Sequence, residues 1–249
     1  MSEPINSSAE RSIQHPTLYR RPRPMALDLD RGLSLQPHTD FRFARATNSV
    51  ALGAVELASA MHHYPIVFTT TGRPAALAVL GLEPDLNFFV DDNGRWQPDA
   101  YIPAYIRRYP FILSERSDST ELTLCIDEEC DRLRQSGDYP LFTDGQPTQL
   151  TRDALNFCRE FHEQTQITAT FVAALLESGL LVENEARLNL EPGRDITLGE
   201  ARFIDEAKFN ALPDTVLLEW RLRGWLPLVY SHLFSMTKWR ALARLAAIS

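Results

Sequence analysis

The sequence is poor in the features that mark several large classes of protein. It contains three cysteines, Cys125, Cys130 and Cys158, and no Cys-x-x-Cys pair, so neither a disulfide framework nor a zinc site is expected. No stretch approaches the roughly 20 apolar residues of a membrane-spanning helix, and the N-terminal segment lacks the apolar core of a signal peptide. These absences predict a soluble, cytoplasmic protein with reduced thiols and no membrane insertion.

Basic charge is scarce as well. The chain has 25 Lys and Arg against 33 Asp and Glu, and its net charge of -8 argues against nucleic-acid binding, which needs a basic face. The sequence holds no Gly-x-Ser-x-Gly elbow, no His-Glu-x-x-His motif, no Gly-x-Gly-x-x-Gly loop and no Walker A sequence. We therefore assign no catalytic residue, no metal ion and no cofactor from the sequence, and we favour a protein that is not an enzyme.

The first half of the chain is rich in strand-forming residues. Turn residues such as Asp91–Gly94, whose Asn-Gly pair favours a type I′ hairpin, separate the apolar runs and leave no room for a crossover helix. Short connections mean antiparallel pairing. The sequence therefore predicts an α+β fold, with an antiparallel β-meander in the first half packed with helices mainly from the second half. The expected strands are 41–44, 66–68, 75–80, 86–90, 111–113 and 122–126, and a short β pair is expected at 188–190 and 201–204.

The second half is rich in helix formers. Residues 149–178 contain no Pro or Gly, which predicts one long helix or two in series, ended by Gly179. Residues 1–16 are polar and weakly patterned, so we expect a disordered tail there and a single domain over residues 17–249. The other expected helices are 53–62, 104–109, 214–223 and 236–247.

One family resemblance is visible in several motifs. The most specific is YIPAYIRRYPF at 101–111, and the others include YPIVF (64–68), LGL (80–82), NFFVD (87–91), GRW (94–96) and GWLPLVYSHL (224–233). In these motifs the sequence resembles the SapC family, named for a gene in a surface-layer protein locus. The resemblance covers nearly all of the chain from residue 17 onward. A peptide-transport permease shares the name but is unrelated.

The resemblance implies little chemistry. Relatives are often encoded near flavin-dependent tryptophan-halogenase-like proteins, cupin-like proteins and TonB-dependent receptors. This context implies a soluble binding or accessory protein, linked to amino-acid, peptide or imported-metabolite processing with halogenase-like partners. One alternative is a hydrolase or transferase that uses His232 with an acid such as Asp205, Glu206 or Asp127. The other is a structural protein associated with the surface layer.

A compact aromatic and basic segment supplies the candidate binding residues. Tyr and Arg are favoured in desolvated recognition sites, and Arg107 or Arg108 could hold a carboxylate through two parallel hydrogen bonds. We expect a recognition surface for a protein partner or a small amino-acid or peptide-like ligand. The alternative is that the tyrosines fill the core and the arginines pair with Asp91, Asp92 or Asp127. The candidate residues are Trp96, Tyr101, Tyr105, Arg107, Arg108 and Tyr109.

Two charged segments each have two interpretations. The basic arm at 19–24, YRRPRP, either docks to an acidic partner or lies extended on the acidic domain, and we favour the second. Asp127, Glu128 and Glu129 could act in acid–base chemistry or hold a metal ion. Adjacent acids more often form the first turn of a helix, and we favour that here.

Overall fold

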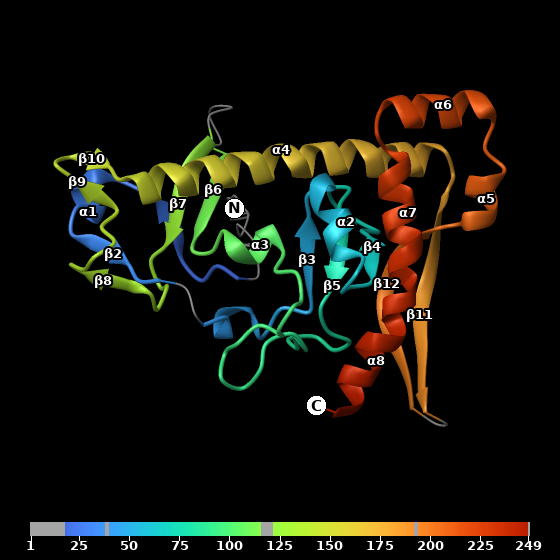
Figure 1. Ribbon diagram of the computed structural model, residues 1–249, viewed down its shortest axis with the longest axis horizontal. Coiled ribbons are helices and arrows are strands. Elements are labelled where there is room, and N and C mark those ends of the chain that lie inside the picture. The colour runs from blue at the N-terminus through green and yellow to red at the C-terminus, as the bar shows by residue number, and fades with distance from the viewer. Residues whose placement is uncertain (1–17, 38–39, 116–121, 192–193, 249) are drawn as a thin grey trace, which may run out of the picture.

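A computed structural model describes residues 18–37, 40–115, 122–191 and 194–248. The expected disordered tail at 1–16 lies outside these residues. A long helix, α4, runs along the length of the molecule, and the C-terminal helices gather at one end (Figure 1). The strands lie below α4 in two groups, one toward each end of the helix (Figure 1).

The larger sheet is antiparallel and has five strands, in the order β11-β12-β4-β5-β3. All three residues of β4 are buried, as expected for β-branched and aromatic side chains in a central strand. The predicted strands at 66–68 and 75–80 are confirmed. The predicted short β pair is a hairpin of two 11-residue strands. The strands are β3 (Ser49–Leu52), β4 (Ile66–Phe68), β5 (Ala76–Val79), β11 (Leu181–Glu191) and β12 (Arg194–Ile204).

A second antiparallel sheet has the order β1-β7-β6. Its edge strand β1 is formed by the basic arm, whose prolines are tolerated at an edge. Arg23 pairs there with Asp30 at 2.6 Å and with Glu128 at 2.8 Å, so the arm lies extended on the domain, as favoured. The predicted meander is thus divided between two sheets, each completed by strands from elsewhere in the chain. The strands are β1 (Pro22–Pro24), β6 (Phe111–Glu115) and β7 (Leu122–Asp127); β2 (Leu33–Leu35) pairs with β8 (Leu133–Gln135), and β9 (Phe142–Thr143) with β10 (Gln146–Pro147).

The predicted helix at 149–178 is one helix of 29 residues, α4 (Gln149–Glu177). Gly179 ends it with a φ of +65°, and the N–H of Leu180 donates to the carbonyl of Leu175, as in a left-handed C-terminal cap. Within the described ranges, no helix is both long and apolar enough to cross a bilayer. The other helices are α1 (Leu27–Asp30), α2 (Leu57–Ala60), α3 (Ala104–Arg107), α5 (Glu206–Asn210), α6 (Asp214–Leu222), α7 (Leu226–Ser235) and α8 (Trp239–Ile248), with 3₁₀ turns η1 (Arg42–Ala44), η2 (Ala54–Glu56) and η3 (Met236–Lys238).

Some local predictions are wrong. Residues 41–44, expected as a strand, include the 3₁₀ turn η1, because four alternating residues cannot distinguish a strand from a turn. The helix expected after Asp127 is a single turn, in which the N–H of Cys130 donates to the carbonyl of Asp127. The chain then enters β8, since pairing with β2 outweighs the weak helical preference of this segment.

The predicted hairpin around Gly94 has a different turn. The N–H of Asp91 donates to the carbonyl of Arg95, the N–H of Gly94 donates to the carbonyl of Asp91, and Gly94 has a φ of +78°. This is the pattern of a three-residue loop with glycine in the left-handed position, not a type I′ turn. Beyond this loop, the strand pairing continues only through the isolated bridge between Val90 and Trp96. Residues 86–90 are therefore not a full strand.

Candidate functional site

The start of α3 is fixed by a buried carboxylate. Glu56 is only 5% exposed, and its side chain accepts hydrogen bonds from the N–H groups of Gly53 at 2.8 Å and Ala104 at 2.6 Å. It also accepts the hydroxyl of Tyr101 at 2.9 Å. Burial and the neighbouring carboxylate raise the pKa of Tyr101 to about 12, so this hydroxyl stays protonated and donates. The Glu56 carboxylate therefore joins Gly53, which precedes η2, to Tyr101 and Ala104 at the start of α3.

Arg107, the last residue of α3, extends this network outward. Its Nε donates to the carbonyl of Ile102 at 3.0 Å, and its Nη2 donates to the hydroxyl of Tyr101 at 3.2 Å. Its guanidinium carbon lies 5.1 Å from the ring centre of Phe157 on α4. Arg107 is exposed, yet its direction is set from three sides.

Arg108, the next residue, lies among aromatic rings. Its guanidinium carbon is 4.5 Å from the ring centre of Tyr105, 4.7 Å from that of Phe161 and 5.7 Å from that of Tyr19. Burial raises the pKa of Tyr19 and of Tyr105, while the positive charge of Arg108 acts in the opposite direction. The hydroxyls remain neutral, so the rings attract the guanidinium through their faces and do not neutralise it.

A cavity of about 590 Å³ opens beside these residues, and we call it the arginine cleft. It lies between the 107–111 segment, β2, the segment before β8 and the first turns of α4. Its volume falls in the range of small-molecule sites. A smaller cavity of about 320 Å³, which includes Tyr101, shares Arg107, Phe157 and Glu160 with it. The arginine cleft is lined by Leu35, Arg107, Arg108, Tyr109, Phe111, Arg132, Leu150, Asp153, Ala154, Asn156, Phe157 and Glu160.

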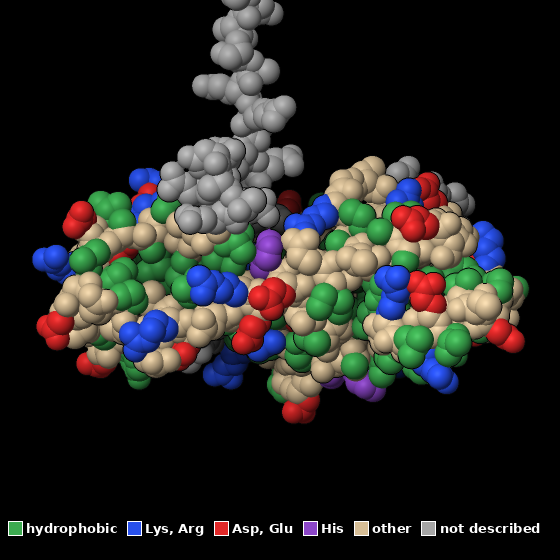
Figure 2. All heavy atoms as spheres, turned by 90° about the horizontal axis from the view of Figure 1, so that it is seen from above, with side chains coloured by type: hydrophobic (Ala, Val, Ile, Leu, Met, Phe, Trp, Pro, Cys, Tyr) green, Lys and Arg blue, Asp and Glu red, His purple; other side chains and the backbone are tan. Residues whose placement is uncertain are grey.

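The three arginines of the cleft have no carboxylate partner among the described residues, where none of the ion pairs involves Arg107, Arg108 or Arg132. Arg132 donates from Nη2 to the carbonyl of Tyr109 at 2.6 Å, but the Nε atoms of Arg108 and Arg132 are buried without a partner. A buried donor that lacks an acceptor costs about 1–3 kcal/mol in a folded protein. Acidic and basic side chains are interspersed on the surface seen from above (Figure 2), so this positive charge is local.

Of the six predicted residues, five lie at or next to the two cavities and one, Trp96, lies in the core. Arg107, Arg108 and Tyr109 line the cleft, Tyr101 lines the adjoining cavity, and Tyr105 lies under Arg108. Trp96 is 7% exposed and packs on Phe41 and Phe89 in the core, away from both cavities. Tyr109 is partly a core residue too, since its ring stacks on Phe43 at 4.2 Å between ring centres and its hydroxyl donates to Asp127 at 3.2 Å.

Three charged residues of the cleft were missing from the sequence-based site. Asp153 and Glu160 come from the first turns of α4, and Arg132 comes from the segment before β8. All three lie more than 20 positions from Arg108 in the chain. Their residue types are common on solvated helix faces and loops, so only contacts between distant segments of the chain distinguish them.

His232, the histidine of the enzyme hypothesis, is fully buried. Its Nε2 accepts the N–H of Ile204 at 3.1 Å, which leaves the proton on Nδ1 to donate to the carbonyl of Ile66 at 2.9 Å. Burial lowers its pKa to about 4. His232 therefore joins α7 to β4 and β12 as a neutral ring, and neither ring nitrogen is free for proton transfer.

The acids of that hypothesis serve other contacts. Asp205 accepts the N–H of Lys208 at the start of α5. The carboxylate of Asp127 accepts the N–H groups of Arg20 at 3.0 Å and Arg21 at 2.9 Å. In the part of the chain that the structure describes, no three His, Cys, Asp or Glu side chains gather in a way that could hold a metal ion.

Comparison with known proteins gives a family. The SapC family model matches residues 30–242 of the 249-residue chain, a span that includes the entire arginine cleft. No curated protein matches the chain, and no solved structure matches it.

Proposed function

This chain belongs to the SapC family, and we propose that it is a soluble accessory binding protein whose arginine cleft takes an amino-acid or peptide-like ligand by its carboxylate. The single observation that carries the proposal is the pair of buried Nε donors of Arg108 and Arg132, which have no partner among the described residues. A buried N–H donor without an acceptor destabilises the fold unless a ligand or another group supplies the acceptor.

The arrangement suits a carboxylate. A guanidinium offers two parallel N–H groups that match the two oxygens of a carboxylate, and such charge-assisted pairs are about twice as strong as neutral hydrogen bonds. The rings around Arg108 orient its plane before a ligand arrives, which lowers the entropic cost of binding.

The opposite charges in the cleft favour a zwitterion. Asp153 and Glu160 provide carboxylates from α4, and Phe157 and Leu150 of the same helix provide apolar surface. A free α-amino acid or a short peptide carries an anionic end, a cationic end and a side chain. Its carboxylate would pair with Arg108 and Arg132, and its ammonium group with the acidic side chains of α4.

The biological setting rests on the family resemblance alone. We propose that the protein acts in the cytoplasm beside halogenase-like partners, in the processing of an amino acid, a peptide or an imported metabolite. The resemblance supports this setting because relatives are often encoded near such proteins. A pull-down with a halogenase-like protein from the same locus tests it.

The ligand is tested by thermal-shift screening of free amino acids and dipeptides, followed by titration calorimetry. Each hit is paired with its carboxyl-amidated form. We expect the free carboxylates to raise the unfolding temperature and the amides to have no effect. Arg108→Met should weaken binding by about 30-fold or more, because a desolvated charge pair is lost.

Arg159→Met, exposed on the same helix α4 but outside the cleft, is the matched control and should bind as the wild type does. No ligand among the carboxylates together with no partner in the pull-down would overturn the proposal. Equal binding of free and amidated compounds would overturn the role given to the carboxylate.

A further inference from the structure

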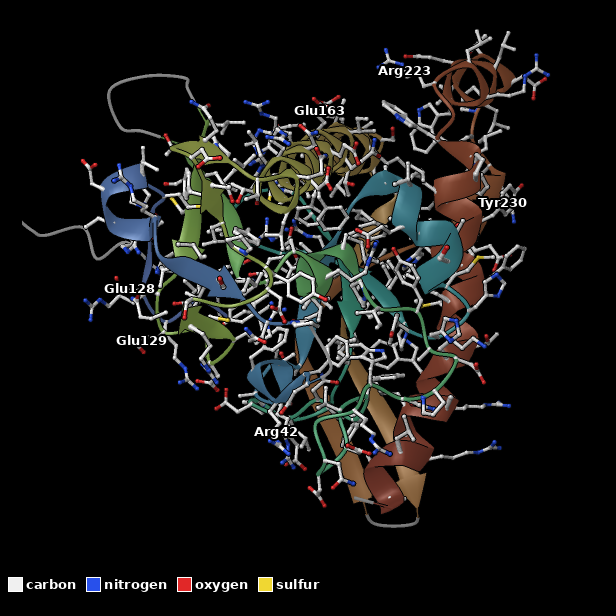
Figure 3. The ribbon with its side chains drawn as sticks, turned by 60° about the vertical axis from the view of Figure 1, so that its left-hand side comes forward. Arg42, Glu128, Glu129, Glu163, Arg223 and Tyr230 are labelled. Carbon is white, nitrogen blue, oxygen red and sulfur yellow. The ribbon has the colours of Figure 1, made fainter. Side chains whose placement is uncertain are left out.

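A second cavity shares Tyr109 and Arg132 with the arginine cleft. Its volume is about 380 Å³. It is formed by three segments that are distant in sequence: the arm before β1, the η1 region and the segment that joins β7 to β8. Its lining residues are Leu18, Arg20, Asp40, Arg42, Phe43, Tyr109, Glu129, Cys130, Asp131, Arg132 and Arg134. Arg42 and Glu129 mark two of these segments in Figure 3.

The basic side chains of this cavity are mostly unpaired. Arg42 forms an ion pair with Asp40 at 2.9 Å. In the part of the chain that the structure describes, Arg20, Arg132 and Arg134 take part in no ion pair. The two remaining acids, Glu129 and Asp131, are exposed, as are Arg20 and Arg134, whereas Arg132 is half-buried and its Nε is buried without a partner.

Asp127 holds the walls in place without neutralising them. Its carboxylate accepts the N–H groups of Arg20 and Arg21 from the arm and that of Glu129, at 3.3 Å, from the opposite wall. Because Arg20 bonds to Asp127 through its backbone N–H, its side chain is not neutralised by this carboxylate, whereas the side chain of Arg21 pairs with Glu128. On the same wall, Arg134 is directed by a bond from Nη1 to the carbonyl of Leu133 at 2.8 Å. The side chains of Arg132 and Arg134 are therefore oriented by hydrogen bonds before any ligand binds.

We propose that this cavity is a second binding site, for a phosphate-type oxyanion held by Arg20, Arg132 and Arg134. Three guanidinium groups approaching from two segments can donate to several oxygens of a tetrahedral anion, whereas one planar carboxylate is matched by a single fork. The anion is either free phosphate or the phosphoryl group of a small phosphorylated compound, for which the volume leaves room. This site is separate from the proposed carboxylate site, although Arg132 lies at both.

Titration calorimetry with inorganic phosphate and with glycerol 3-phosphate tests the proposal on the full chain. We expect saturable binding of at least one probe, and tighter binding of glycerol 3-phosphate if the site takes a phosphoryl group. Arg134→Gln and Arg20→Gln should each weaken binding by about tenfold or more, because each removes a charge-assisted contact to the anion. Arg31→Gln, an exposed arginine outside the cavity, should leave binding unchanged.

The two sites can fail separately. Arg108→Met should weaken carboxylate binding by about 30-fold or more and keep phosphate binding, since Arg108 lines only the arginine cleft. Urea denaturation of each variant shows whether it is folded. No saturable binding of either probe, or an equal loss in Arg134→Gln and Arg31→Gln, would overturn the phosphate site and leave the carboxylate site unaffected.

Discussion

The polar interior near His232 and the polar interior near Arg108 are built in opposite ways. Both ring nitrogens of His232 are used by backbone groups of the sheet, and the ring is neutral. Arg108 keeps its charge, is surrounded by three aromatic rings and has a buried Nε without a partner. A polar group that stabilises a fold has its hydrogen bonds completed within the fold. The Nε1 of Trp96 also lacks a partner but lies in the core, whereas Arg108 lines an open cavity in which a ligand can supply the acceptor.

Glu56 and Asp127 belong with His232. The Glu56 carboxylate accepts two backbone N–H groups and a tyrosine hydroxyl, and the Asp127 carboxylate accepts three backbone N–H groups and the hydroxyl of Tyr109. Each joins segments that are far apart in the chain. Their residue types suggest catalysis, but their complete hydrogen bonding indicates structural roles.

The largest predicted effect is that of His232→Gln. A glutamine cannot place an acceptor and a donor at the two ring-nitrogen positions, so the buried groups of Ile204 and Ile66 lose partners. We expect the free energy of unfolding to fall by about 4 kcal/mol in urea denaturation. His62→Gln, at an exposed position, should change it by less than about 0.5 kcal/mol. Similar losses of unfolding free energy in both variants would contradict the structural role given to His232.

Asp127→Asn should come next. The amide N–H₂ of asparagine would face backbone N–H donors that now meet a carboxylate oxygen. We expect a loss of about 3 kcal/mol in the free energy of unfolding and faster limited proteolysis next to β1, because the arm loses its attachment. Asp138→Asn, exposed in the nearby loop, is the control. An unchanged proteolysis rate at β1 would contradict the role given to Asp127.

Acid should weaken the fold through His232. A histidine whose folded pKa lies near 4, below the unfolded value of about 6.5, binds its proton only in the unfolded chain at intermediate pH. Its contribution is therefore complete above the unfolded pKa and is lost as the pH falls toward 4. The expected loss between pH 7 and pH 5 is about 2 kcal/mol. The difference between wild type and His232→Gln should shrink by this amount, and a constant difference would contradict it.

The smallest predicted effect on stability is that of Arg108→Met. Methionine keeps apolar contact with Tyr105 and Phe161 and removes a charge that lacks a counter-ion. Replacement of buried charges by apolar residues of similar size is often neutral or stabilising. We expect the free energy of unfolding to stay within about 1 kcal/mol of the wild type, measured by urea denaturation. A loss of unfolding free energy as large as that of His232→Gln would show that Arg108 stabilises the fold, as His232 does.

The sequence predicts those parts of the fold that depend on local pattern. The absence of Pro and Gly from 149–178 predicts α4, and the β-branched run at 66–68 predicts β4; both are confirmed. Such local patterns do not predict which strands pair with one another in a sheet. That β1 pairs with β7, and β12 with β4, depends on which distant segments bury each other's apolar surface.

The candidate site shows the same division. The motif at 101–111 places Arg107 and Arg108 at the cleft, because their helical spacing brings them beside the tyrosines of the same segment. It cannot indicate that Trp96 packs into the core instead, or that Arg132 reaches the cleft from the β7–β8 connection. These placements follow from contacts between distant segments, since Trp96 packs on Phe41 and Arg132 donates to the carbonyl of Tyr109, and local spacing does not encode them.

One linkage measurement tests the central claim, that the buried Nε donor of Arg108 is left incomplete for a carboxylate ligand. The free energy of unfolding of wild type and of Arg108→Met is measured with and without the best carboxylate from the screen. At a concentration 100 times the dissociation constant of the wild type, the ligand should stabilise the wild type by about 2.7 kcal/mol and the variant, which binds about 30-fold more weakly, by about 0.9 kcal/mol or less. A variant that is several kcal/mol less stable without ligand, and gains as much as the wild type with it, would contradict the account.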